Sequence, residues 1–221
     1  MTRRLVAEAL GTALLLAIVV GSGIMGEKLA AGNAAVALLA NAVATGAGLF
    51  VLITIFAPIS GAHFNPVVSL AAAVSRTLTV REALGYIVAQ FFGACVGVIT
   101  AHAMFGLALL QTSVRARSTF GEYLGEIIAT LGLILTIRLS ARAPLSQVAA
   151  AVALWITAAY WFTSSTSFAN PAVTFARSLT DTFAGIAPNN VAAFIAAQLL
   201  GMGLALLLLR ALLLPEHSSD R

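Results

Sequence analysis

Six long apolar stretches, separated by short polar interruptions, make up most of this 221-residue chain. They fall at about residues 5–25, 34–58, 84–110, 122–139, 146–164 and 191–214. A helix needs roughly 20 residues (about 17–25) to cross the hydrocarbon core of a bilayer. Only 9% of the residues are charged and the mean hydropathy is +1.00, whereas a soluble domain carries about 25% charged residues. We therefore expect an all-helical membrane protein, and not a soluble enzyme, a disordered chain or a β-barrel of alternating strands.

The rest of the composition narrows the class further. The net charge of +4 comes from scattered basic residues, a distribution that does not indicate nucleic-acid binding. The single cysteine, Cys95, excludes an intramolecular disulfide and a Cys-rich metal site. No segment between the apolar stretches is long enough for a soluble domain. We expect residues 1–221 to form one membrane domain without a metal or other cofactor.

The distribution of Lys and Arg predicts the orientation of the chain. With the N-terminus in the cytoplasm, the cytoplasmic ends of the spans carry eight basic residues and the opposite ends carry four. Such an excess is typical of cytoplasmic loops. Both termini are then cytoplasmic, which requires an even number of spans and agrees with six.

Three sequence features occur twice, once in each half of the chain. They are a Glu in the first span, an Asn-Pro box, and a Gln in the third span: Glu8 and Glu126, Asn65 and Asn170, and Gln90 and Gln198. The partners are 118, 105 and 108 residues apart, so the matches keep nearly one register. Each half holds three spans, an odd number, and the second half must therefore be inverted relative to the first. We expect inverted repeats at residues 1–110 and 118–214.

Each Asn-Pro box opens an apolar segment that is too short to cross the bilayer, at residues 65–75 and 170–180. Pro at the first helical position and Asn at the N-cap both favour the start of a helix. Inversion brings the N-termini of these two half-helices together near the midplane, where partial charges of roughly +0.5 each disfavour cations. Irregular backbone at this depth survives only inside protein or against a water-filled cavity. The pattern predicts a channel in which the amides of Asn65 and Asn170 face neutral, hydrogen-bonding solutes.

With these paired boxes the chain resembles the major intrinsic protein family, the aquaporins and aquaglyceroporins. The likeness extends from Glu8 to Gly201. The boxes read Asn65-Pro66-Val67, with Val where the family usually has Ala, and Asn170-Pro171-Ala172. The resemblance implies a right-handed bundle of six transmembrane helices and two re-entrant half-helices, with one pore per subunit. It also implies a homotetramer in the bacterial inner membrane, with Glu8 and Glu126 accepting hydrogen bonds from loop backbone.

Four positions form the outer constriction, or selectivity filter, of that family, and here they depart from the usual residues. The resemblance places there Thr45, Ala158, Ser167 and Val173. The position of Val173 is nearly always Arg in the family, so up to five donors and a charge are missing. Such a ring should be wide and uncharged. It resembles the filter of aquaglyceroporin-like channels associated with bacterial arsenic resistance, which implies water, small polyols and neutral metalloid hydroxides such as arsenous acid as solutes, and methylated arsenicals as further candidates.

The sequence allows more than one role for two further residues. Arg177 lies four residues after Val173, on the same helix face. It could restore part of the missing charge, pair with Asp181 or lie in the vestibule, and we favour pairing or the vestibule. His63, beside the first box, could gate the pore by protonation or simply pack the loop, and packing is the commoner case.

An ion-coupled secondary transporter is the alternative to a passive channel, since it too uses inverted repeats and broken helices. It should carry ionisable residues at the midplane, where only Glu8 and Glu126 are candidates. An intramembrane enzyme has no support, because the sequence contains neither His-Glu-x-x-His nor Gly-x-Ser-x-Gly.

Overall fold

The computed structural model describes residues 1–213, and within that range the regular elements are all helical. Six helices are long and apolar enough to span a membrane, which confirms the predicted fold class. They are α1 (Thr2–Leu29), α2 (Ala34–Ser60), α4 (Val80–Met104), α5 (Phe120–Leu139), α6 (Leu145–Phe162) and α8 (Pro188–Leu212). Three short elements accompany them: α3 (Pro66–Val74), α7 (Pro171–Ala176) and the 3-10 turn η1 (Arg177–Leu179). The predicted end of the last span at residue 214 and the basic residue Arg221 lie outside the described residues.

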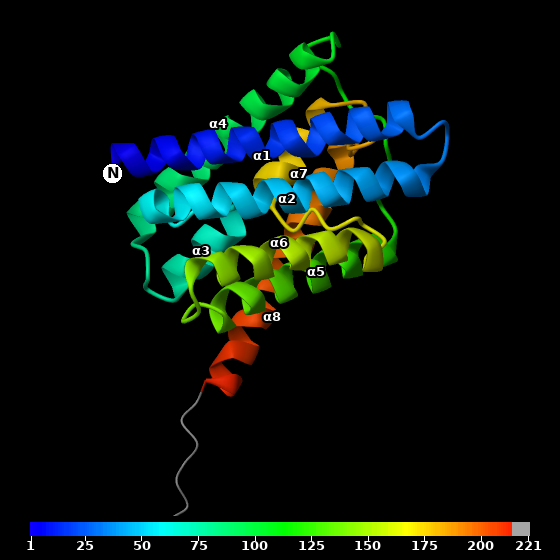
Figure 1. Ribbon diagram of the computed structural model, residues 1–221. Helices are drawn as coiled ribbons and strands as arrows, with labels where there is room; N and C mark the ends of the chain where they lie inside the picture. Colours follow the sequence, from blue (N-terminus) through cyan, green and yellow to red (C-terminus); the bar gives the residue numbers. More distant parts are fainter. Residues whose placement is uncertain (214–221) are drawn as a thin grey trace, which may run out of the picture.

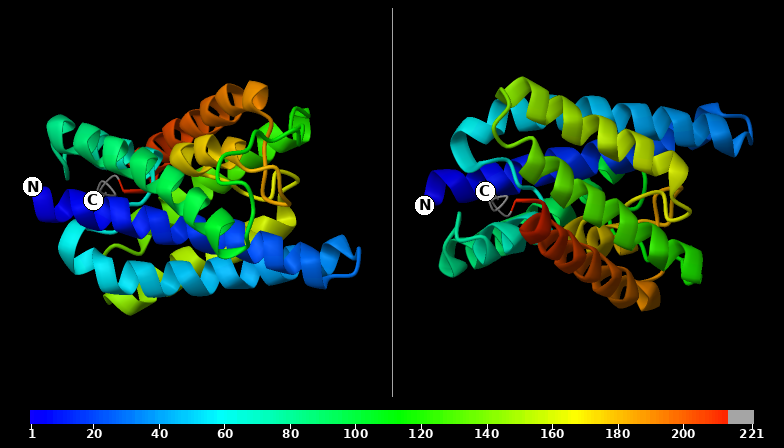
Figure 2. Two further views of the ribbon diagram at one scale, coloured as in Figure 1. Left: turned by 90° about the horizontal axis from the view of Figure 1, so that it is seen from above. Right: turned by 90° about the horizontal axis from the view of Figure 1, so that it is seen from below.

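The long helices pack in the same order in both halves of the chain (Figure 1). In the first half α1 packs against α4 and α2, and in the second half α5 packs against α8 and α6. Helices α2 and α6 join the halves, and the short helices α3 and α7 lie between the long ones. The start of α1 and the end of α8 lie at the same end of the bundle, as an even number of spans requires (Figure 2).

The boundaries of α4 differ from the apolar stretch predicted at 84–110. The helix begins earlier, at Val80, because Thr79 and Glu82 form a capping box in which each side chain satisfies a backbone N–H of the other. It ends at Met104, and Gly106 then adopts a left-handed conformation with φ of 67°. Residues 105–110 are apolar but not helical, so hydropathy alone placed this helix too far along the chain.

The two half-helices begin as the sequence predicts, with Asn at the N-cap and Pro at the first helical position. The Oδ1 atom of Asn65 accepts from the N–H of Val67 at 3.0 Å. The Oδ1 atom of Asn170 accepts from the N–H groups of Ala172 and Val173 at 3.0 and 3.2 Å. The second half-helix is shorter than predicted, because the chain tightens into η1 after Ala176.

Glycines at matching positions let the long helices approach closely. A Cβ atom on Gly93 would lie 2.1 Å from the carbonyl oxygen of Ala9, and one on Gly201 would lie 2.4 Å from that of Ile127. These neighbours are backbone atoms of the facing helices α1 and α5, so no side-chain rotation can relieve the clash. Small residues at membrane helix interfaces allow this kind of close backbone contact.

We expect Gly93→Ala to destabilise the folded protein by about 1–3 kcal/mol, the usual cost of overpacking. The measurement is the temperature at which detergent-solubilised protein loses its monodisperse peak in size-exclusion chromatography. Gly203→Ala is the matched control, because a Cβ atom there has no neighbour within 4 Å. Equal transition temperatures for the two variants would contradict the close approach of α1 and α4.

Candidate functional site

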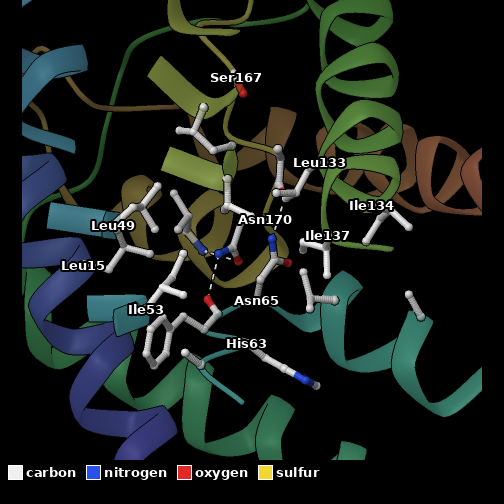
Figure 3. A pocket seen from close by; sticks show the side chains of 18 of the residues that line it. Leu15, Leu49, Ile53, His63, Asn65, Leu133, Ile134, Ile137, Ser167 and Asn170 are labelled. Atoms are coloured by element: carbon white, nitrogen blue, oxygen red, sulfur yellow. Dashed lines mark hydrogen bonds between the residues drawn. The ribbon is translucent and has the colours of Figure 1, made fainter. Parts of the chain in front are cut away.

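A cavity of about 350 Å³ runs between the helices and is lined by residues from both halves of the chain. Its lining extends from Arg138, at the end of α5, past the half-helices to Arg177. Most of the wall is apolar, with side chains such as Leu15 and Leu133. Figure 3 shows Asn65 and Asn170 side by side at its centre, with Ser167 towards one end and His63 towards the other. A passage of this composition offers a solute few polar contacts, and they are concentrated at the centre and the ends.

The two asparagines hold the tips of the half-helices against each other. The Nδ2 atom of Asn65 donates to the carbonyl oxygen of Ala169 at 2.7 Å, and the Nδ2 atom of Asn170 donates to that of Phe64 at 2.8 Å. A carboxamide has two N–H donors, so each side chain keeps one for the cavity that both line. The centre of the cavity therefore presents two donors and the N-terminal ends of two helices.

The carboxylate of Glu8 holds the loop that precedes the first half-helix. It accepts from the backbone N–H groups of His63 and Phe64 at 3.0 and 2.7 Å. Two side chains complete its shell, with Ser60 Oγ at 2.6 Å and Gln90 Nε2 at 2.8 Å. The carboxylate is fully buried, and these four donors compensate for its removal from water.

The carboxylate of Glu126 makes matching contacts in the second half. It accepts from the backbone N–H groups of Phe168 and Ala169, both at 2.8 Å, and from Gln198 Nε2 at 2.6 Å. Like its counterpart, it is fully buried. Each acid thus fixes one loop of the central cavity from the first helix of its own half.

Both loops contain residues in the left-handed conformation at matching places. Ala62 and Phe64 have φ of 51° and 49°, and Ser167 and Ala169 have φ of 51° and 48°. Such conformations cost about 1–3 kcal/mol each when the residue is not glycine, and they persist only where the surroundings enforce them. The carboxylate hydrogen bonds to the N–H groups of these loops supply that constraint.

Three of the four residues expected at the outer constriction line the cavity: Thr45, Ser167 and Val173. The expectation for Ala158 is wrong, because this residue lies on the exposed face of α6. Ile156 and Tyr160 line the cavity instead. They are four residues apart and share a helix face, whereas Ala158 lies half a turn from each. The Tyr160 hydroxyl lies 3.2 Å from Thr45 Oγ1, so a phenol and not a methyl group lies beside Thr45 in the cavity.

Arg177 lines the cavity at the end away from Arg138 and is only 2% exposed. It does not pair with Asp181, whose carboxylate accepts from the N–H of Val114 at 3.0 Å. Its guanidinium carbon lies 3.4 Å from the centre of the Phe168 ring, and its Nε donates to the carbonyl oxygen of Ala184. A guanidinium stays protonated at neutral pH, so Arg177 carries a positive charge beside the cavity.

His63 lines the cavity on the opposite side of the asparagines. Its Nδ1 atom lies 3.0 Å from Ser69 Oγ, and its ring packs edge-on against Tyr86 with centroids 5.3 Å apart. These contacts fix the imidazole as part of the loop packing. No group of three His, Cys, Asp or Glu side chains suited to a metal ion occurs within residues 1–213.

The sequence interpretation did not identify Tyr160 or Phe168 as residues of the site. Tyr160 has a weak signal in the sequence, because a spacing of four residues places it on the same face of α6 as Ile156. Phe168 has no such signal, since its role depends on the folded chain bringing the guanidinium groups of Arg177 and Arg117 onto its ring.

Two half-helices that meet tip to tip within a six-helix membrane bundle, beside a cavity lined from both halves, define this protein as a membrane channel.

Known proteins resemble this chain in sequence and in fold. Residues 1–144 match the family model described as Major intrinsic protein. Aquaglyceroporin AqpS of Rhizobium meliloti (strain 1021) is 54% identical, over 98% of this chain and 93% of its own. The chain belongs to the major intrinsic protein family, and it is a channel protein, not an enzyme.

Two further known proteins resemble this chain less closely. Probable aquaporin TIP2-2 of Oryza sativa subsp. japonica is 36% identical, over 63% of this chain and 57% of its own. The X-ray structure of the aquaglyceroporin from Plasmodium falciparum has a TM-score of 0.77 and covers 97% of each chain, at 20% sequence identity. The second likeness concerns the fold alone.

Proposed function

We propose that this protein is a wide, passive channel for small uncharged solutes. These are water, glycerol-like polyols and neutral metalloid hydroxides such as arsenous acid, with methylated arsenicals as further candidates. The observation that carries the proposal is the outer constriction, where Val173 takes the place of the usual Arg beside the small side chains of Thr45 and Ser167. Pore diameter, lining hydrogen-bond groups and electrostatic barriers determine selectivity in such channels.

The centre of the cavity supports uncharged solutes in particular. Asn65 and Asn170 each offer a free N–H, and two helix N-termini add positive potential. A hydroxyl oxygen can accept from these donors while the solute slides along the apolar wall. The name of the relative from Rhizobium meliloti, an aquaglyceroporin, supports glycerol as a solute.

Ion-coupled transport is less well supported. Within residues 1–213 no Asp or Glu lines the cavity. Glu8 and Glu126, the two candidates for coupling, are each occupied by three or more hydrogen-bond donors from the protein. A carboxylate that must bind and release a coupling ion would have to break these contacts in every cycle.

Residues 1–110 and 118–214 are, in this proposal, two copies of one duplicated unit. Besides the loops and acids, matching side-chain contacts support the duplication. In each half the Gln of the third span donates to a hydroxyl of the half-helix: Gln90 to Ser69 at 2.9 Å, and Gln198 to Thr174 at 2.7 Å.

The proposal also includes a homotetramer in the bacterial inner membrane, with both termini in the cytoplasm. Support for the tetramer comes from family membership, and support for the orientation comes from the Lys and Arg distribution. His63 is proposed as a fixed pore-lining residue and not as a gate, because Ser69 and Tyr86 hold its ring.

Stopped-flow light scattering on proteoliposomes tests this function. We expect glycerol and arsenous acid to permeate down their gradients far faster than in empty liposomes, at rates proportional to concentration. Proton and sodium gradients should leave both rates unchanged, since none of the described residues that line the cavity is an acid that could couple an ion. Flux that saturates at low concentration and requires an ion gradient would favour the transporter, and flux of water alone would contradict a wide filter.

A further inference from the structure

The outer end of the cavity holds a buried positive charge that the filter position itself lacks. Arg177 lines the cavity one helical turn beyond Val173. Only its Nε donor has a partner within residues 1–213, the carbonyl oxygen of Ala184. The two terminal nitrogens make no hydrogen bond to the described residues, and the residue lines the cavity. The remaining donors of this guanidinium are therefore available to the cavity.

The surroundings hold Arg177 in place without neutralising it. Its guanidinium stacks on the ring of Phe168, which also contacts the guanidinium of Arg117 at 4.9 Å. Arg117 donates from Nε to the Gly185 carbonyl and from Nη1 to the Ser165 carbonyl, both at 3.0 Å. The only ion pair found within residues 1–213 lies elsewhere, between Arg4 and Glu82. Arg117 thus serves the packing of the outer loops, while the charge of Arg177 remains uncompensated.

A second unpaired group lies near the same end of the cavity. Ser167 is 3% exposed, lines the cavity, and its Oγ has no hydrogen-bond partner within the described residues. A buried hydroxyl without a hydrogen-bond partner is uncommon, so we expect water or a solute in the cavity to bind to it. Together with the guanidinium of Arg177, it adds polar groups to an otherwise largely apolar lining.

We infer that Arg177 is the cation-excluding residue of the outer constriction. From one helical turn beyond Val173, it supplies the positive charge that the usual filter Arg would provide. This inference rests on the proposed function. It assigns the width of the constriction and its positive charge to two different residues, whereas a single filter Arg would determine both. Val173 leaves the ring wide enough for polyols and metalloid hydroxides. Arg177 keeps a fixed positive charge beside the path, and such a charge forms an electrostatic barrier to cations and protons.

Ion leak in proteoliposomes tests the inference, with sodium and proton flux measured under imposed gradients and glycerol permeability measured in parallel. We expect Arg177→Leu to raise sodium and proton flux by at least about tenfold, because a unit charge close to the path is removed from a poorly screened environment. Glycerol permeability should persist, since the ring at Val173 is unchanged. Arg177→Lys keeps the charge and should keep the leak low.

Arg115→Leu is the matched control, because this exposed outer-loop arginine carries the same charge but does not line the main cavity. Its leak should equal that of the wild type. If Arg177→Leu conducts glycerol yet leaks no more than Arg115→Leu, the inference is wrong while the proposed function stands.

A measurement on the unmodified protein covers the case in which Arg177→Leu does not fold. The residual ion leak of wild-type proteoliposomes should prefer chloride over sodium, as a positive constriction requires. A preference for sodium would overturn the inference. Absence of glycerol flux in the wild type would instead contradict the proposed function itself.

Discussion

Replacing Glu126 by Leu should remove most of the folded, conducting protein. The substitution leaves the N–H groups of Phe168 and Ala169 and one donor of Gln198 without their acceptor in the interior. Each unsatisfied buried donor costs about 1–3 kcal/mol, so the sum is a large part of the stability of an ordinary protein. The loop also loses the contact that holds the left-handed Ala169 in place. Yield of monodisperse protein and glycerol permeability per molecule are the two measurements.

Two further variants define the cause of that loss. Glu126→Gln keeps one acceptor oxygen and should be intermediate in both measurements. Glu27→Leu removes an acid from the exposed end of α1 and should leave yield and permeability unchanged. Should Glu126→Leu fold and conduct glycerol like the Glu27→Leu control, the loop would not depend on the buried carboxylate.

Val173→Arg should narrow the passage through the proposed channel. Val173 is 5% exposed and lines the cavity, so a longer side chain at this position must enter the passage. We expect glycerol permeability to fall about tenfold relative to water permeability, which corresponds to about 1.4 kcal/mol of additional barrier. Arsenous acid should follow glycerol, since both are bulkier than water.

Val173→Leu is the control that distinguishes the effect of a slightly larger side chain from the effect of the guanidinium group. It adds one methylene without charge and should leave the ratio of glycerol to water permeability near that of the wild type. The double variant Val173→Arg with Arg177→Leu keeps the number of charges constant and should still be narrow. If Val173→Arg passes glycerol as well as wild type, Val173 is not at the constriction.

The sequence predicted the parts of the fold that depend on local chemistry. Hydropathy located the six spans, since an apolar stretch of about 20 residues in a membrane protein is long enough to cross the bilayer as a helix. Each Asn-Pro box marked the start of a half-helix, because an N-cap and a Pro at the next position act within a few residues. Helix ends were less predictable, as at Met104, where a glycine turn interrupts an apolar stretch.

The outer constriction was predicted only in part, because it depends on how separate segments meet. Val173 follows the second box directly, so its place beside the cavity required no further alignment. The family resemblance places Ala158 there, but a shift of two positions on α6 exchanges its exposed face for the face that lines the cavity. The position of Arg177 depends on the Phe168 ring and the Ala184 carbonyl, neither of which hydropathy or residue spacing indicates.

The temperature dependence of glycerol permeability in wild-type proteoliposomes tests most directly whether an open path passes between the two asparagines. An open passage predicts a shallow dependence, close to that of diffusion in water, with no saturation and no effect of an ion gradient. A steep dependence that matches empty liposomes, or a rate that follows an imposed proton gradient, would contradict it.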